Sequence, residues 1–357
     1  MFQIVPRNEC DRTAWNAAAD CFPAAWAWHR SELLDARATW SRTEDLSFCI
    51  CDPSNGHKIV ALVPLVLVRP RSLSLFLGSH FESTGAPAID PSLPRRSVRK
   101  VHEFIYDAIV SLANDNRARR TDFSVAPLSP EVRSIDRPFP NPLCQFGAKD
   151  TSTQSWVLKI SDQGGEEKLW EGLEYRSRKQ ISKAKRAELV ADIKIPNSSL
   201  LETYYDLHLL TCTRNGILPH PKAYFKAIFE NPDGQKMCTT VVVRNGHTVL
   251  TIQNFLIYKD AAIYWTVASS DDALKLCAND FGMWTAIRHF HAKGLEYLEC
   301  GEAFPAADTG KQRGLNDFKK SFGGQLFPYY RGAIYHKPLF EGLLGMLRHC
   351  RKRGAAT

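Results

Sequence analysis

The stretch GLNDFKKSFGG, residues 314–324, combines two aromatic residues, two lysines and three glycines. Phe318 and Phe322 are four residues apart, so a helical turn would place both rings on one side. An apolar, strand-like run at 295–300 comes before this stretch and ends in a Gly-Glu pair at 301–302. We therefore predict a short helix, anchored by aromatic rings, that holds a lysine pair beyond a strand end. Residues that contact ligands often lie in such places, although a solvated surface helix is the alternative.

The length and composition indicate an ordinary globular protein. At 357 residues the chain is long enough for about two domains. Apolar residues make up 44% and charged residues 24%, which excludes a disordered or fibrous chain. The formal net charge of +8 suits a protein that meets phosphates or another anionic partner.

Neither a membrane span nor a metal site is expected. The N-terminal residues carry charges without a long apolar core, and the longest apolar run, 59–68, is interrupted by Pro64. We therefore expect a cytoplasmic protein. The ten cysteines include no zinc-type or CxxC spacing, so we expect reduced thiols and no metal ligands. Cys49 and Cys51 would share one face of a strand.

The first domain is expected to cover residues 1–150. Two strand-like runs, 46–51 and 58–67, flank the turn sequence DPSNG at 52–56, which predicts an antiparallel hairpin. Helical periodicity at 12–36 and 97–114, with further strands at 74–77 and 122–126, completes one α/β layer unit. Trp26, Trp28 and His29 are candidates for a pocket, but aromatic core is the favoured reading.

The second domain is expected to cover residues 151–338, followed by a basic tail at 339–357. It reads as a related, longer version of the same α/β unit, although no residue-level repeat is visible. We expect strands at 156–160, 191–195, 237–243, 249–258, 261–267, 295–300 and 327–336, and helices at 166–189, 200–214, 222–230 and 279–293.

The expected helix at 166–189 carries a dense positive charge. Six basic residues fall within about three helical turns, which becomes useful if phosphates come close. A solvated face is an equally weighted alternative. These residues are Arg176, Arg178, Lys179, Lys183, Lys185 and Arg186.

Four pieces of the second half, in order, resemble a known family. They are Arg178-Lys-Gln-Ile-Ser-Lys183-Ala184; Thr211-Cys-Thr-Arg214-Asn-Gly216 with Pro219-His-Pro221 and Tyr224-Phe225; Asn279-Asp-Phe-Gly-Met-Trp284-Thr-Ala286-Ile287 with Gly294 and Leu298-Glu-Cys-Gly301; and Gly314-Leu315, Phe318-Lys319 and Phe322-Gly323. Together they span residues 178–323. The sequence is similar to the FemAB/FemX group of peptidoglycan-peptide aminoacyltransferases, a branch of the GNAT superfamily with BioF2-like acetyltransferase domains.

The resemblance implies two tandem GNAT-like domains, each a mixed, mostly antiparallel sheet flanked by helices, with the acceptor in a groove between them. It also implies that Phe318-Lys319 matches the family's catalytic position, and that Arg214 stands where some relatives contact phosphate. The sequence departs from the family in two respects. It has no heptad-rich arm of the kind some members use with tRNA, and residues 269–279 contain no glycine where CoA-dependent GNATs have a pyrophosphate loop.

Acyl transfer to an amine requires a stabilised oxyanion and a route for protons. We assign oxyanion stabilisation to Lys319, oriented by Phe318, with Lys320 as the alternative. Glu302 is a candidate proton acceptor or a structural residue. Arg214, Arg178, Lys179, Lys183 and Trp284 are the candidate contacts of phosphate or substrate.

Three functions are open at this stage. The first is direct aminoacyl or acyl transfer to an amine of a cell-envelope or exopolysaccharide precursor. The second is CoA-dependent N-acetylation of a small amine, and the third is a non-catalytic module that binds an anionic ligand. No tightly bound cofactor is expected, and the donor is aminoacyl-tRNA or acyl-CoA. A nucleotide-linked acceptor, tRNA binding and peripheral membrane contact through residues 339–353 stay open.

Overall fold

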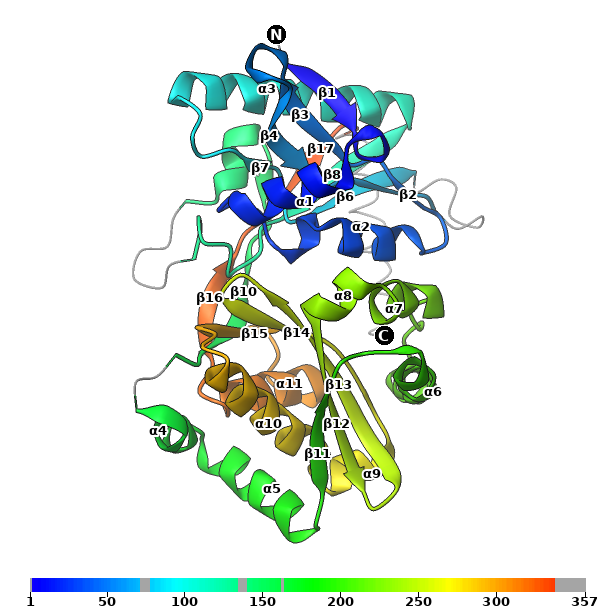
Figure 1. Ribbon diagram of the computed structural model, residues 1–357, viewed down its shortest axis with the longest axis vertical. Helices are drawn as coiled ribbons and strands as arrows, with labels where there is room; N and C mark the ends of the chain where they lie inside the picture. Colours follow the sequence, from blue (N-terminus) through cyan, green and yellow to red (C-terminus); the bar gives the residue numbers. More distant parts are fainter. Residues whose placement is uncertain (1, 71–77, 134–139, 162–163, 338–357) are drawn as a thin grey trace, which may run out of the picture. The chain divides into compact units, whose positions relative to one another are not determined.

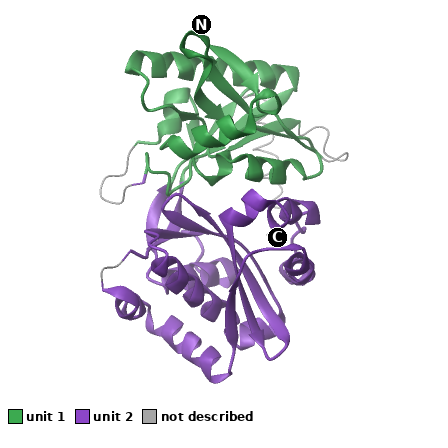
Figure 2. Cartoon of the chain, viewed as in Figure 1, with its two compact units in different colours: residues 1–132, 137–152, 329–357 green, residues 133–136, 153–328 purple. Residues whose placement is uncertain are grey.

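The computed structural model describes residues 2–70, 78–133, 140–161 and 164–337, and these residues form two compact units (Figure 2). Unit 1 contains residues 1–132, 137–152 and 329–357, whereas unit 2 contains residues 133–136 and 153–328. The division thus falls close to the expected residue 150. It differs from the expected boundaries because the chain returns to unit 1 after residue 328. The expected strand at 74–77 and the tail at 339–357 lie outside the described residues.

Unit 1 is built from two sheets and three α-helices in the described part of the chain (Figure 1). Its elements are β1 (Gln3–Pro6), η1 (Arg7–Glu9), α1 (Arg12–Cys21), η2 (Ala27–His29), α2 (Ser31–Ala38), β2 (Thr43–Asp45), β3 (Phe48–Asp52), η3 (Pro53–Asn55), β4 (Lys58–Val63), β5 (Val66–Val68), β6 (Ser79–Thr84), β7 (Ala88–Ile89), α3 (Arg95–Asp115), β8 (Ala118–Ser124), η5 (Pro142–Phe146), β9 (Lys149–Asp150) and β17 (Arg331–Tyr335).

Alternation along the β3–β4 hairpin divides the core of unit 1 into two clusters. Cys49 and Cys51 are buried with Trp15 of α1 on one face, whereas Ile50 joins the cluster that α3 contributes to on the other. The predicted hairpin and the shared face of the two cysteines are therefore confirmed. Gly56 ends the turn with a φ of 62°, a left-handed conformation that favours glycine.

The predicted strand 58–67 is two strands that belong to different sheets. The first sheet has the order β1-β3-β4-β7 and the second the order β2-β5-β6-β8-β17-β9. Pro64, which cannot donate to a strand ladder, stands between β4 and β5. The chain therefore changes sheets at this proline, and the expectation of one continuous strand is wrong.

Unit 2 contains one seven-stranded sheet with helices on both faces (Figure 1). Its elements are β10 (Thr153–Lys159), α4 (Gly165–Glu171), α5 (Tyr175–Arg186), β11 (Val190–Lys194), α6 (Ser198–Asn215), α7 (Lys222–Phe229), α8 (Pro232–Met237), β12 (Cys238–Asn245), β13 (Thr248–Tyr258), β14 (Ala261–Ser269), α9 (Asp271–Lys275), α10 (Ala278–Ala292), β15 (Tyr297–Glu302), α11 (Gly310–Lys320) and β16 (Gln325–Tyr329).

The sheet of unit 2 runs in the order β11-β12-β13-β14-β15-β10-β16. Its strands pair antiparallel from β11 to β14, and β14 pairs parallel with β15. The residues of α10 that face the sheet, such as Ile287 and Phe290, share one core with Val241 of β12. The expected mixed, mostly antiparallel sheets flanked by helices are therefore confirmed.

Two further predictions for unit 2 are wrong in their boundaries. The expected helix 166–189 is interrupted between α4 and α5 at residues 172–174, where Gly172 lies at the end of α4. The expected last strand 327–336 is also two strands, separated at Tyr330. Its first part, β16, belongs to the sheet of unit 2, whereas β17 pairs antiparallel with β8 of unit 1.

Candidate active site in unit 2

Two strands of unit 2 run parallel and then separate. Residues 261–263 of β14 lie in register with 297–299 of β15, but β14 continues to Ser269 and β15 to Glu302. On its other side β15 carries a bulge, because Trp156 and Val157 of β10 face Gly301 and Glu299, which leaves Cys300 as the extra residue. Bulges bend a strand and often occur beside active sites. The carboxyl end of β15 thus leaves β14 after Glu299 and stays paired with β10 through the Gly-Glu pair.

Lys319 of α11 reaches this strand end. Its side chain is nearly buried, with the residue 9% exposed, and Nζ donates a hydrogen bond to the backbone oxygen of Glu302 at 2.8 Å. Nζ also lies 5.6 Å from the ring centroid of Phe304. Burial lowers the pKa of Lys319 below its ordinary value, against the opposing influence of Cys300, Glu299 and Glu302. An ammonium in such surroundings acts strongly on charge that develops nearby.

Gly301 lies beside Lys319 in the bulge. Its φ of +87° is one that residues with a Cβ rarely adopt, and a Cβ at this position would lie 3.6 Å from Lys319 Nζ. The lysine therefore packs directly on exposed backbone at the strand end.

Glu299 is a buried carboxyl group on the same strand. Its only side-chain donor among the described residues is Ser155 Oγ, at 2.9 Å. Burial raises the pKa of Glu299 to about 7, although the Ser155 hydrogen bond and the charge of Lys319 both lower it. A carboxyl group that titrates near neutral pH can accept or release a proton during a reaction.

Further titratable groups surround the same part of the sheet. Burial raises the pKa of Asp280 on α10 to about 6, against the charge of Arg176. Burial also raises the pKa of Cys300 to about 12 and raises that of Tyr264 on β14. Clusters of perturbed titratable groups are typical of functional sites, although structural networks also produce them.

The helix that carries Lys319 is fixed from several sides. The Phe318 and Phe322 rings pack edge to face with centroids 5.1 Å apart, and both join the main core of unit 2. Asn316 Nδ2 donates to the Phe304 oxygen at 2.8 Å, and the Phe304 nitrogen donates to Asn316 Oδ1 at 3.0 Å. The predicted anchoring of this helix by its two phenylalanine rings is therefore confirmed.

The basic helix α5 begins beside α11. Ser177 Oγ donates to Ser321 Oγ at 2.6 Å, which ties the start of α5 to the end of α11. Two of its candidate phosphate contacts already have backbone partners: Arg178 Nη1 donates to the Glu171 oxygen at 2.9 Å and Lys183 Nζ to the Lys275 oxygen at 2.7 Å. Lys179 is exposed, so it presents its charge to solvent.

Arg214 holds the end of β14 rather than pointing freely into solvent. Its guanidinium donates to the backbone oxygen of Ser269 at 2.9 Å and to Asp271 Oδ1 at 2.8 Å. Between β14 and α10 the chain forms a short helix, α9, with Asp271 and Asp272 in its first turn. The structure does not bring Arg214 into the group formed by Lys319 and Glu299.

Trp284 lies in the core. Its side chain is 2% exposed and packs against Trp170 of α4, with ring centroids 5.2 Å apart. The expectation that Trp284 contacts substrate is at odds with this burial, because neighbouring side chains cover the indole. Its helical spacing with Ile287 and Phe290 is the sequence signal of a core position.

The site thus combines predicted and unpredicted residues. Lys319, Phe318 and Glu302 lie together, as the sequence indicated, whereas Ser155, Glu299 and Asp280 were not singled out. One signal was available for Glu299: it is a carboxylate in the middle of an apolar strand, where an unpaired charge is costly. In the described part of the chain no group of three or more metal-ligating side chains occurs. No helix there is both long and apolar enough to span a bilayer.

One comparison with known proteins concerns this same region. Residues 174–320, from the start of α5 to Lys320 of α11, match a family model described as an acetyltransferase (GNAT) domain. A search of curated proteins found no match.

Solved structures share the fold of nearly the whole chain. FemX is similar with a TM-score of 0.68 and 12% identity, covering 95% of this chain and 99% of that one. A tandem GNAT protein from the clavulanic acid biosynthesis pathway has a TM-score of 0.53 and 12% identity, covering 94% and 99%. The C-terminal domain of a putative lysylphosphatidylglycerol synthetase from Agrobacterium fabrum has a TM-score of 0.52 and 14% identity, covering 93% and 94%. The expected FemX-like tandem GNAT fold is therefore confirmed.

Proposed function

We propose that this chain, a transferase with a GNAT domain and a FemX-like fold, transfers an aminoacyl or acyl group directly to an amine acceptor at Lys319. The observation that carries this proposal is the buried ammonium of Lys319, held at 2.8 Å from the backbone oxygen of Glu302, at the end of β15 beyond the residues that pair with β14. Only one of its three N–H groups has a hydrogen-bond acceptor among the described residues, so the others are available to a ligand.

The proposed reaction needs two groups at this strand end. The amine nitrogen of the acceptor attacks the carbonyl carbon of the donor, and the carbonyl oxygen becomes negatively charged. Lys319 stabilises that oxygen, which then re-forms the carbonyl as the donor's leaving group departs. The attacking amine loses one proton to a carboxylate. Glu299, with its pKa raised to about 7, suits this role, while Glu302 is the alternative that the sequence suggested.

The acceptor class follows by analogy with proteins that share the fold. Two such structures are named FemX and a putative lysylphosphatidylglycerol synthetase, and the second name contains an aminoacylated lipid. We propose an amine of a cell-envelope or exopolysaccharide precursor as acceptor and aminoacyl-tRNA as donor, with Lys179 among the phosphate contacts. Extraction and mass spectrometry of the small molecules and RNA that co-purify with the protein would test these assignments.

Acyl-CoA is the second candidate donor, because the matching family model describes an acetyltransferase domain. Against it, the segment before α10 contains no glycine, and Arg214, the candidate phosphate contact, is already paired with Asp271 there. Calorimetric titration with acetyl-CoA separates the two donors: tight binding would replace our first choice with the second.

Replacing Lys319 tests the proposed chemistry. We expect Lys319→Met, which keeps most of the side-chain volume, to lower the rate of transfer by about 10²–10³-fold. Single-turnover transfer of a labelled acyl group, from whichever donor binds, would measure this change. Lys320→Met is the matched control, because Lys320 is the exposed neighbour, 3.9 Å from Glu174. Full activity of a folded Lys319→Met protein would overturn the site and favour a non-catalytic binding module.

A further inference from the structure

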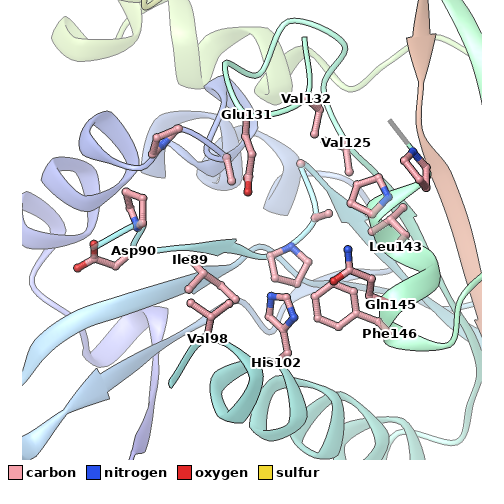
Figure 3. Close-up of a pocket in the computed structure, with 18 residues that line it drawn as sticks. Ile89, Asp90, Val98, His102, Val125, Glu131, Val132, Leu143, Gln145 and Phe146 are labelled. Atoms are coloured by element: carbon pink, nitrogen blue, oxygen red, sulfur yellow. The ribbon is translucent and has the colours of Figure 1, made fainter. Parts of the chain in front are cut away.

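Unit 1 contains a pocket that the proposed chemistry of unit 2 does not use (Figure 3). Its volume is about 550 Å³, within the range of sites that hold small organic ligands. The wall comes from the segments around α1, β6, β7, α3, β8 and η5, all of which belong to unit 1.

The pocket exists because the two sheets of unit 1 separate here. β6 runs parallel to β8 in the six-stranded sheet, and the chain then turns at residues 85–87 and joins the four-stranded sheet as β7. Ligands of α/β proteins often bind beyond the carboxyl ends of parallel strands, at the point where the connections from neighbouring strands lead in opposite directions. Gly85 and Ala86, which follow β6, and Val125, which follows β8, all line the pocket.

A buried histidine makes this turn rigid. The Trp26 nitrogen donates to His29 Nδ1 at 3.0 Å, so Nε2 carries the hydrogen and donates to the Ala86 oxygen at 2.8 Å. Gly85 and Ala86 have φ angles of +105° and +57°. A left-handed alanine costs free energy and persists only where the surrounding structure holds it in place. The wall is therefore preformed.

The lining is mainly apolar, and its polar groups define a preference. Ile89, Val98 and Phe146 contribute hydrocarbon surface, while Glu131 and His102 enter the cavity from opposite sides in Figure 3. Burial lowers the pKa of His102, which favours its neutral form, and partial burial raises the pKa of Glu131. Among the described lining residues none is Lys or Arg. The lining also includes Asp90, which is already paired with Lys58 at 2.7 Å. Glu131 is therefore the carboxylate that the described lining offers to an occupant.

We propose that this pocket binds a small amine with an apolar body, whose ammonium group pairs with Glu131. Charge complementarity selects the head group, and the apolar walls select a hydrocarbon or aromatic body. Anionic ligands such as carboxylates and phosphates would face Glu131, whereas Lys58, the cation beside the lining, is already paired with Asp90. This site lies within unit 1 and does not depend on the reaction proposed for unit 2.

Three probes with the same hydrocarbon tail test the head-group preference. Octylamine, octanol and octanoate would be titrated calorimetrically into the full chain at pH 8. We expect octylamine to bind most tightly and octanoate most weakly. Glu131→Gln should weaken octylamine about tenfold and leave octanol unchanged, because only the charged hydrogen bond is lost. Glu103→Gln, on the exposed side of α3, is the matched control.

Filling the pocket tests the location. Val98→Trp should abolish octylamine binding, whereas Ser111→Trp, exposed on the same helix, should not. Ala24→Leu, from another wall, replaces Val98→Trp if circular dichroism shows that the tryptophan variant is unfolded. Equal or tighter binding of octanoate, no binding of octylamine, or binding that survives filling would each overturn the proposal.

Discussion

Each unit contains a glycine of positive φ near the end of a parallel strand. In both units a buried side chain donates a hydrogen bond to the backbone oxygen of the residue that follows this glycine. In unit 1, His29 donates to Ala86 beside Gly85 at 2.8 Å; in unit 2, Lys319 donates to Glu302 beside Gly301, also at 2.8 Å. The two donors differ in whether any of their hydrogen-bonding groups remains available to a ligand. Both ring nitrogens of His29 are engaged by backbone, whereas the ammonium of Lys319 keeps N–H groups for a ligand. Similar backbone geometry thus supports a rigid wall in one unit and a reactive group in the other.

Adding a Cβ at the two glycines should show this difference most strongly. We expect Gly85→Ala to lower the free energy of unfolding by about 2–5 kcal/mol, from backbone strain together with overlap with His29. A Cβ there would lie 2.6 Å from a carbon of the fully buried His29 ring. Gly301→Ala should cost about 1–2 kcal/mol, because only the backbone is strained and the Lys319 contact is an ordinary 3.6 Å.

Urea unfolding followed by tryptophan fluorescence would measure both costs. Gly56→Ala is the control for strain alone, since its φ is +62° and nothing lies within 4 Å of the added Cβ. A Gly85→Ala variant no less stable than Gly56→Ala would show that the His29 wall is not rigid.

The buried Glu299 at the strand end of unit 2 should also make the free energy of unfolding depend on pH. Because the folded pKa of Glu299 is about 7, above the value of about 4.3 in an unfolded chain, the folded state holds this proton more tightly. The free energy of unfolding therefore falls as the pH rises from about 4.3 to 7. We expect Glu299→Gln, which can still accept from Ser155, to remove about 2–3 kcal/mol of that fall.

Unfolding titrations in urea at several values between pH 5 and pH 8 would test this sign. The matched control is Glu296→Gln, an exposed position just before the same strand. If the wild-type and Glu299→Gln proteins lost stability in parallel, Glu299 would not be the group that titrates.

The smallest effects should come from the basic helix, where the same contrast applies to surface charges. Arg178 and Lys183 already donate to backbone oxygens, so replacing either with Ala should cost about 1 kcal/mol of stability. Lys179→Ala should change stability by less than about 0.5 kcal/mol. If tRNA is the donor carrier, Lys179→Ala should also reduce the slope of log affinity against log salt by about one.

Filter binding of tRNA at several salt concentrations would measure this slope. Lys236→Ala, another exposed lysine of unit 2, is the control. An unchanged slope in Lys179→Ala would mean that this face of α5 is only solvated.

Local sequence patterns predicted most helices, strands and turns, because the conformation of these elements depends on residues close together in the sequence. The DPSNG turn, the spacing of Phe318 and Phe322, and Gly216 after α6 each determine a local conformation. The candidate lysine could be singled out for the same reason, since its helix follows a strand that ends in Gly-Glu.

What the sequence did not reveal depends on partners far along the chain. Nothing local at Pro64 or Tyr330 tells which sheet the next strand joins. The raised pKa of Glu299 arises from burial by elements distant in sequence, and the bulge at Cys300 depends on the register with β10. Arg214 was expected at a phosphate, but the position of Ser269 beside it is set only by the packing of α6 on β14.

The return of β17 to unit 1 determines when each unit receives its last strand during synthesis. Residues 331–335 pair with β8 on one side and β9 on the other, so they fill an interior position of the six-stranded sheet. A ribosome releases residues 1–150 long before it reaches residue 331. Until then β8 and β9 lack the strand that joins them, and their edges are exposed to wrong partners. The described strands of unit 2 are all made by residue 329, so the unit that begins the chain is the last to receive its final strand.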